Sequence, residues 1–423
     1  MSVARTVASV LLFVALAAGG VGLAYLGYKA FLDDQEEPAA PAEVTTVAPP
    51  PATTAAEPVE REEIWPVFGG DLRRTGAADG ADLRPPFRRL WTVRGGSLLE
   101  FPPVAAYNRV YFGTNSGLFF AVDALTGEPA WQKDFGRCIA SSPAVADDVV
   151  YVSLMDPSPC AQHDEEAPGY LVALDADTGK RLWRFKAGVN ESSPLVANGI
   201  VYFGTWDGKV YALDAERHKP VWTYQTGDKV KGGVAFAKGT VYAGSYDGKL
   251  YALDARTGSL RWEAAAPGGG DFYATPVVAG GRVFAGSTDR NVYAFDAKTG
   301  ELVWTFATGG FVYGAAAVWK KTVYVGSYDG LFYALDARTG EKVWSFEADG
   351  EISGSATVLA GIVYFSTLAG TSYGLNAGSG AEEWIFGEGK YAPIVADRER
   401  VYVTGYARVY GFEPKSAEDA AEG

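Results

Sequence analysis

Six aspartates recur at a nearly constant spacing and are the first candidates for chemistry. Each opens a stretch such as Asp336-Ala337-Arg338-Thr339-Gly340, and Asn376 takes the same place in the next unit. An aspartate there can accept hydrogen bonds from the amides ahead of it, and glycine supplies a left-handed residue. We therefore interpret these carboxylates as turn caps and predict no catalytic acid among them. The six are Asp123, Asp175, Asp214, Asp254, Asp296 and Asp336.

The chain holds two cysteines and two histidines, Cys138, Cys160, His163 and His218. His163 lies in an insertion. His218 replaces the glycine of one of the aspartate turns, whose consensus is Asp-Ala-x-Thr-Gly and which are called DAxTG turns from here on. These two positions lie at opposite ends of the fold by the order of strands in the repeated unit. A shared metal site is therefore not predicted.

The aspartates belong to a repeated unit, which the stretch VYVGSYDGLFYALDARTGEKVW at 323–344 represents. Val323-Tyr324-Val325 is typical of a strand, Asp329-Gly330 predicts a two-residue hairpin turn, and Leu331 to Asp336 would be the return strand. The unit ends on a tryptophan. Aligned tryptophans are separated by 40, 52, 39, 40, 42, 40 and 40 residues, and they are Trp91, Trp131, Trp183, Trp222, Trp262, Trp304, Trp344 and Trp384. A period near 40 with several short strands predicts the blades of a β-propeller.

The two ends of the series indicate how the ring closes. Only RRL precedes Trp91, whereas the last unit, VYVTGYARVYGFEP, has two strands and no tryptophan after them. The Trp91 strand can supply the missing outer strand of that last blade, which removes a free sheet edge. We therefore predict an all-β, eight-bladed propeller of four-stranded antiparallel blades, closed by the N-terminal strand.

The units resemble the PQQ-like, or quinoprotein-type, β-propeller repeat, VYxGSxDGxLYALDxxTGxxxW. The match is close at 201–222, 241–262, 283–304 and 323–344, and looser at 110–131, 150–183, 363–384 and 401–413. The lead-in Trp65 to Gly76, WPVFGGDLRRTG, also resembles the segment ahead of such propellers. The resemblance implies the fold for residues 64–414 and a form similar to the outer-membrane protein assembly propeller. It does not decide function, because this repeat also builds dehydrogenases and sensor ectodomains.

In such a blade, the loop into the inner strand and the turn between the second and third strands lie at the same end of the ring. Cys138 falls in the first kind of loop and Cys160 in the second kind of the same blade. A disulfide between them is therefore expected, and it would suit an oxidising compartment. The alternative is two free buried thiols.

That same end carries the sequence variation, whereas the DAxTG end is nearly uniform. Variable loops on a rigid scaffold are where binding residues concentrate. The aromatic residues there could supply rigid contact area to a partner, or they could pack between blades. Arg137, Lys229, Lys231 and Lys390 mix there with Glu100, Glu191, Asp271 and Glu351. The aromatic candidates are Phe101, Trp206, Tyr246, Phe272, Tyr273, Phe311, Tyr313, Tyr328 and Tyr391.

A formal net charge of −14 argues against a nucleic-acid partner, which needs a basic face. Residues 1–32 contain an uncharged run, Thr6 to Tyr28, long enough to span a bilayer. We predict a single-pass anchor there, with a cleaved signal peptide as the alternative. Residues 33–63, rich in Pro, Ala, Thr and Glu, are expected to be a disordered tether, and 415–423 a disordered tail. The propeller would lie outside the cytoplasm at the cell membrane.

The quinone-dependent dehydrogenases of the family hold their cofactor with a vicinal cysteine pair and a calcium ion. Cys138 and Cys160 are not adjacent, so neither PQQ nor calcium is predicted. The leading hypothesis is a non-catalytic binding scaffold or sensor ectodomain with a protein partner. The alternatives are a PQQ-dependent dehydrogenase and a cell-wall glycan-binding protein.

Overall fold

The computed structural model describes residues 44–46, 63–78, 83–158, 160, 164 and 167–416, all within the compact unit Ala42–Gly423. The predicted anchor lies outside these residues, as do most of the predicted tether and tail. Within the described part of the chain, no helix has the length and apolar character needed to cross a membrane.

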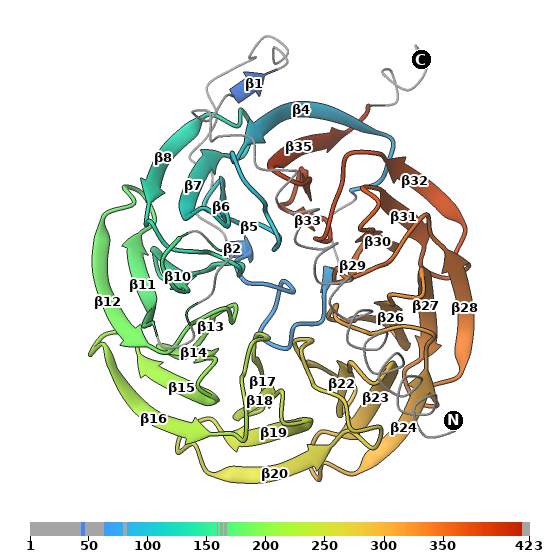
Figure 1. Cartoon of the computed structure of the whole chain (residues 1–423). Coiled ribbons are helices and arrows are strands. Elements are labelled where there is room, and N and C mark those ends of the chain that lie inside the picture. Colours follow the sequence, from blue (N-terminus) through green and yellow to red (C-terminus); the bar gives the residue numbers. More distant parts are fainter. Residues whose placement is uncertain are drawn as a thin grey trace, which may run out of the picture. The chain divides into compact units, whose positions relative to one another are not determined.

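Eight antiparallel sheets form a ring in this unit, as predicted (Figure 1). Each blade runs from a short inner strand to an outer strand. The first is β5 (Val104–Ala106), β6 (Arg109–Gly113), β7 (Leu118–Asp123) and β8 (Pro129–Asp134); the second is β9 (Ala144–Ala146), β10 (Val149–Leu154), β11 (Gly169–Asp175) and β12 (Arg181–Ala187). The third is β13 (Leu195–Ala197), β14 (Ile200–Gly204), β15 (Lys209–Asp214) and β16 (Lys219–Gln225); the fourth is β17 (Ala235–Ala237), β18 (Thr240–Gly244), β19 (Lys249–Asp254) and β20 (Leu260–Ala265).

The remaining blades repeat this order. The fifth is β21 (Val277–Ala279), β22 (Arg282–Gly286), β23 (Asn291–Asp296) and β24 (Leu302–Ala307); the sixth is β25 (Ala317–Trp319), β26 (Thr322–Gly326), β27 (Leu331–Asp336) and β28 (Lys342–Glu347). The seventh is β29 (Thr357–Leu359), β30 (Ile362–Ser366), β31 (Ser372–Asn376) and β32 (Glu382–Phe386). The eighth is β33 (Val395–Ala396), β34 (Val401–Thr404), β35 (Arg408–Pro414) and β4 (Phe87–Arg94).

Closure by the Trp91 strand is confirmed. Strand β4 pairs with β35, so that Trp91 lies opposite Gly411 and Val93 opposite Val409. The first and last parts of the propeller thus share one sheet, which leaves the ring without a break.

Six of the eight aligned tryptophans tie their blade to the next one. In six cases the indole Nε1 donates a hydrogen bond to the carbonyl oxygen of the alanine in the next blade's DAxTG turn, at 2.9–3.2 Å. The glycine of that turn lies against the ring: a Cβ on Gly340, whose φ is +76°, would come within 2.7 Å of Trp304. Two of the eight tryptophans, Trp183 and Trp384, are not among these six. At Trp183, His218 takes the place of the turn glycine with a positive φ, and its ring centroid lies 4.9 Å from that of Trp183.

The aspartates of these turns are caps, as predicted. Asp336 Oδ1 accepts hydrogen bonds from the amides of Arg338 and Thr339 and from Thr339 Oγ1. The Asp-Gly hairpins, in contrast, are wider than predicted. Gly330 has a positive φ but Asp329 does not. Ser327 N donates a hydrogen bond to Leu331 O, and the Asp329 side chain caps the loop by accepting a hydrogen bond from Leu331 N.

Three short strands extend the sheets. Strand β1 (Val44–Thr46) pairs with the outer edge of β4, within the segment predicted as a disordered tether, because its β-branched residues suit a strand and β4 offers free backbone groups. Strand β2 (Glu63–Trp65) pairs with β5, and β3 (Ala77–Ala78) runs parallel to β29.

Residues 65–78, here called the axial segment, lie inside the ring of inner strands (Figure 1). Carbonyl oxygens of Pro66, Leu72, Arg73, Thr75 and Gly76 accept hydrogen bonds from the inner edges of β9, β17, β21, β25 and β29. Arg74 is 1% exposed, and its guanidinium donates to the carbonyls of Phe68, Ser193, Pro194 and Val234. The lead-in therefore satisfies backbone groups that the innermost strands would otherwise leave unpaired.

Candidate functional site

The variable end of the ring is made of two kinds of connection: the loops that lead into the inner strands, here called inner-strand loops, and the turns between second and third strands. In every blade, both kinds of connection lie at the same end of the ring, and loops and turns of neighbouring blades therefore come together. Most of the aromatic candidates meet in two neighbouring groups there.

The first group, here called the aromatic patch, crosses the fourth, fifth and sixth blades. Tyr246 contacts Tyr273 with ring centroids 6.2 Å apart, Tyr273 contacts Tyr313 at 5.4 Å, and Tyr313 contacts Tyr328 at 5.0 Å. Phe311 adds contacts to Tyr313 and Tyr328 and is 39% exposed. The four tyrosines are half-buried, so each presents only part of its ring.

The second group, here called the cage, adjoins the patch at Tyr246. Lys231 Nζ lies 4.1 Å from the ring centroid of Trp206 and 5.3 Å from that of Tyr246. It also lies 3.5 Å from Glu191 Oε2. These residues belong to the third and fourth blades, and together they surround an ammonium group with two aromatic rings and a carboxylate.

Glu191 is the centre of the hydrogen bonding in the cage. It is 6% exposed and accepts hydrogen bonds from Trp206 Nε1 at 2.8 Å and from the Tyr273 hydroxyl at 3.1 Å. Burial, followed by the nearby charge of Glu191, holds the pKa of Tyr273 well above its ordinary value. At ordinary pH, Tyr273 is therefore a neutral donor that fixes the carboxylate in place.

Glu100, from the first blade's inner-strand loop, interacts electrostatically with Glu191 and Lys231 of the cage. Burial, with the negative charge of Glu191 as the next cause, raises its pKa to about 7, and Lys231 opposes the shift. The next residue, Phe101, packs against the cluster that contains Val189 and Trp206. Among the residues that the structure describes, none donates a hydrogen bond or forms an ion pair with the Glu100 carboxylate.

Three of the predicted aromatic residues do not join the patch or the cage surface. Phe272 is fully buried against Tyr293 and Phe295, which is the blade packing that the sequence left open as an alternative. Phe101 is half-buried against Phe68. Tyr391 is half-buried in the eighth blade's inner-strand loop, with Lys390 Nζ 5.3 Å from its ring.

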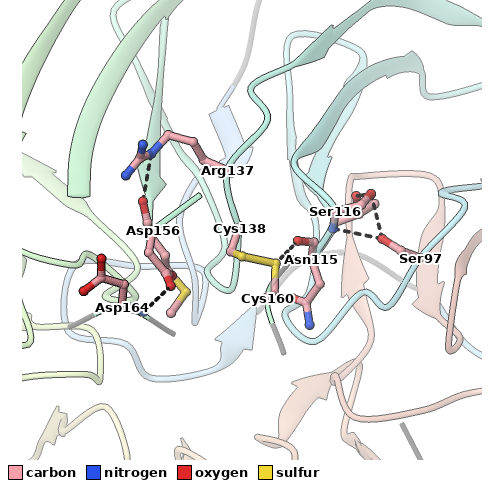
Figure 2. Close-up of a disulfide and its surroundings, with 10 residues drawn as sticks. Ser97, Asn115, Ser116, Arg137, Cys138, Asp156, Cys160 and Asp164 are labelled. Carbon is pink, nitrogen blue, oxygen red and sulfur yellow. Dashed lines mark hydrogen bonds between the residues drawn. A yellow bond between two sulfur atoms is a disulfide. The ribbon is translucent and has the colours of Figure 1, made fainter. Parts of the chain in front are cut away.

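The predicted disulfide between Cys138 and Cys160 is confirmed, with the two Cα atoms 5.6 Å apart. Figure 2 shows it joining the inner-strand loop of the second blade to the insertion between β10 and β11. Backbone hydrogen bonds between Cys138 and residues 155 and 156 hold the same connection. Cys138 packs in one cluster with Met155, Val189 and Trp206, so the bridge supports one side of the cage.

Sequence reasoning named Glu100, Glu191 and Lys231 only as scattered charges and did not single out Arg74. The sequence did place each of these four residues in an inner-strand loop or in the lead-in. What the sequence lacked was the distance between loops, because Glu191 and Tyr273 are 82 residues apart. In the described part of the chain, no group of three or more His, Cys, Asp or Glu side chains could hold a metal ion.

A family profile described as "Outer membrane protein assembly factor BamB" matches residues 88–162, 165–231, 207–317 and 307–420. The chain is 29% identical over 158 residues to the outer membrane protein assembly factor BamB of Burkholderia pseudomallei, which covers 36% of this chain and 38% of the relative. It is 35% identical over 110 residues to a quinohemoprotein alcohol dehydrogenase of Comamonas testosteroni, covering 23% of this chain and 14% of the relative. The chain thus spans well under half the length of these relatives.

Solved structures show the same fold. The crystal structure of BamB from Moraxella catarrhalis aligns with a TM-score of 0.64 at 22% identity, covering 78% of this chain and 98% of that one. The quinohemoprotein alcohol dehydrogenase from Comamonas testosteroni aligns with a TM-score of 0.69 at 16% identity, covering 83% and 81%. At these identities the likeness concerns the fold alone.

Proposed function

The chain belongs to the family of the outer membrane protein assembly factor BamB, and from that premise we propose that it is a non-catalytic scaffold that binds a protein partner through the variable end. The single observation that carries this proposal is the aromatic patch. Its rings come from three successive blades and remain partly exposed on a rigid ring.

The patch has the composition that protein interfaces favour. Tyrosine and phenylalanine give large contact areas and lose little conformational entropy on binding, because few torsions are free. Neighbouring rings also hold one another in place, so the surface is already ordered before a partner arrives. A sensor ectodomain would use the same surface, and a glycan could stack on the same rings.

We further propose a location outside the cytoplasm, with residues 1–32 as a single-pass membrane anchor. The disulfide supports this location, since such bonds persist in oxidising compartments. The apolar run from Thr6 to Tyr28 supports the anchor.

A quinone cofactor is not part of the proposal, because the residues present fit it poorly. The two cysteines are separated by 22 positions and do not form a vicinal pair. The Trp206 ring, 8% exposed, already has Lys231 over it and could not stack on a planar cofactor unless that lysine moved. Incubation with PQQ and calcium, followed by dye reduction over alcohols and sugars, tests the dehydrogenase alternative; saturable turnover would establish it.

Site-specific photo-crosslinking in intact cells tests the scaffold proposal. A photoreactive residue at Phe311 or Tyr328 is expected to capture the same protein, since the two rings are in contact. The matched control is Arg338, an exposed residue of a DAxTG turn in the same blade. Capture from Arg338 with none from Phe311 or Tyr328 would show that the variable end is the wrong surface.

A further inference from the structure

The DAxTG end of the fourth, fifth and sixth blades carries an excess of positive charge. These neighbouring blades (Figure 1) contribute three DAxTG turns, the starts of the outer strands that follow them, and three turns between first and second strands. Together these connections hold nine Lys and Arg residues and five Asp and Glu residues. They are here called the basic arc and comprise residues 238–240, 254–261, 280–282, 296–303, 320–322 and 336–343.

The corresponding connections of the first three blades have the opposite balance. They hold five Lys and Arg residues and eight Asp and Glu residues, in the ranges 107–109, 123–130, 147–149, 175–182, 198–200 and 214–221. The formal net charge of the whole chain is −14. The positive balance is therefore a local property of the basic arc and not of DAxTG turns in general.

Most cations of the basic arc are open to an anion from outside the chain. Arg261 pairs with Asp254 at 2.8 Å, and the half-buried Arg282 donates to the carbonyl oxygen of Ala337. Three of the five carboxylates are occupied as turn caps that accept backbone amides. The other seven cations are exposed and form no ion pair with the residues that the structure describes; they are Lys238, Arg256, Lys298, Lys320, Lys321, Arg338 and Lys342.

Exposed aliphatic side chains lie close to these cations along the chain. Leu260, Leu302 and Val343 are 43%, 46% and 56% exposed near the starts of β20, β24 and β28. Leu182 and Val221 are exposed near the starts of β12 and β16 as well, so charge is what distinguishes the basic arc. Cations interspersed with aliphatic side chains suit the surface of an anionic bilayer, where headgroup charge lies above an apolar layer.

We propose that the basic arc lies on an anionic lipid bilayer and binds its phosphate headgroups. This inference rests on the membrane anchor proposed above. Strand β1 is part of the propeller, so only residues 33–43 would separate it from that anchor, and eleven residues span at most about 40 Å. The propeller would therefore stay near the bilayer, with the basic arc toward the lipid and the variable end directed away from it, toward a protein partner.

The distribution of the cations favours a bilayer over a single anionic group. They come from three successive blades, so they are spread along the ring and do not converge on one point. The phosphates of a bilayer are also spread over a surface, and each Lys or Arg near that surface adds to the attraction. The attraction depends on charge, so it should disappear at about 1 M salt, where the screening length is about 3 Å.

Fluorescence quenching in proteoliposomes of the full chain tests the proposal. A fluorescent label is attached at Ser259→Cys, exposed in the basic arc, or at Ala307→Cys, exposed at the variable end of the fifth blade; the two native cysteines are joined to each other. Lipids with a nitroxide headgroup quench a label that lies at the bilayer surface. We expect quenching at Ser259 in vesicles that contain phosphatidylglycerol, none in vesicles of phosphatidylcholine alone, and none at Ala307 in either. Quenching at Ala307 in place of Ser259, or at neither position, would overturn the proposal.

Two double variants with the same change in net charge separate the basic arc from a general charge effect. Lys320→Glu with Lys321→Glu, in the arc, should remove most of the quenching at Ser259. The matched control is Lys180→Glu with Arg181→Glu, two exposed cations at the DAxTG end of the second blade, which should keep the quenching. An equal loss in both variants would contradict the proposal. An unchanged thermal unfolding temperature in both shows that folded proteins are being compared.

Failure of this proposal and failure of the scaffold proposal give different results. Protein capture from Phe311 without quenching at Ser259 would leave the scaffold standing and remove the bilayer contact. Quenching without capture would leave the bilayer contact and remove the scaffold. No quenching at Ser259, together with a protein captured by a photoreactive residue at the same position in cells, would assign the basic arc to an acidic protein and overturn the lipid proposal.

Discussion

The two ends of the ring use the same residue types for opposite purposes. At the DAxTG end, backbone amides within three residues lower the pKa of Asp296 and Asp336. At the variable end, burial and neighbouring carboxylates raise the pKa of Glu100 and Asp271. A carboxylate that is satisfied locally stabilises its own turn, whereas the pKa of one that interacts with side chains from other blades depends on how those blades pack.

The difference extends to the contacts between blades. At the DAxTG end, the same Trp-to-alanine hydrogen bond recurs six times, with small variation. At the variable end, Glu191 joins side chains of the third, fourth and fifth blades in an arrangement that occurs once. The repeated contact builds the scaffold, whereas the single arrangement belongs to the candidate site.

The largest expected effect is on the repeated tryptophan contact. Trp304→Ala should lower the free energy of unfolding by about 3–5 kcal/mol, because it leaves a cavity beside Gly340 and removes the hydrogen bond to Ala337. Chemical denaturation measures the loss. Phe311→Ala, at an exposed ring of the variable end, is the control and should change stability by less than about 0.5 kcal/mol. Equal losses would remove the distinction between the ends.

The disulfide should show the next largest effect. Cys138→Ser with Cys160→Ser opens a loop with a sequence separation of 22, which in the chain-entropy account costs about 3 kcal/mol. Reductant should destabilise the unsubstituted protein by the same amount and leave the double variant unaffected. A stability independent of reductant in both proteins would show that the bridge contributes nothing.

Glu100 should make stability depend on pH in the direction opposite to a turn cap. Its folded-state pKa, about 7, lies above the ordinary value of 4.5, so its stabilising contribution is complete below the ordinary value and is lost as pH rises through about 7. The unfolding free energy of the unsubstituted protein, relative to Glu100→Gln, should therefore fall between pH 5 and pH 8 by on the order of 2 kcal/mol. A parallel pH profile for the two proteins would contradict the burial of this carboxylate.

A smaller loss is expected from a single turn cap. Asp336→Ala removes an acceptor for two amides and one hydroxyl and should cost about 1 kcal/mol. Thermal unfolding can detect this change. Asp336→Asn, which keeps an acceptor oxygen as Asn376 does naturally, should recover most of it; no recovery would mean that the negative charge is what matters.

The sequence was sufficient for the fold because its signals are local and repeated. The Trp spacing set the number of blades, and the lone Trp91 strand set the closure with β35. The disulfide was also predictable from the sequence, because both cysteines belong to one blade.

The candidate site was predictable only as a list of residues. Whether Tyr273 reaches Glu191 and whether Phe272 is buried depend on how loops of different blades pack. The axial segment was missed for the same reason, because Arg74 meets carbonyls 119 to 160 residues away. Repeats report contacts between neighbouring blades, and they carry no information on contacts across the axis.

The division between the two ends can be tested most directly by one measurement, the yield of protein captured by photo-crosslinking from Phe311 in two variants of the full chain. Tyr313→Ala, which removes the ring at the centre of the aromatic patch, should abolish capture while the protein stays folded. Asp336→Ala should lower stability and leave capture unchanged. The reverse result, with capture surviving Tyr313→Ala and lost in folded Asp336→Ala protein, would contradict the account.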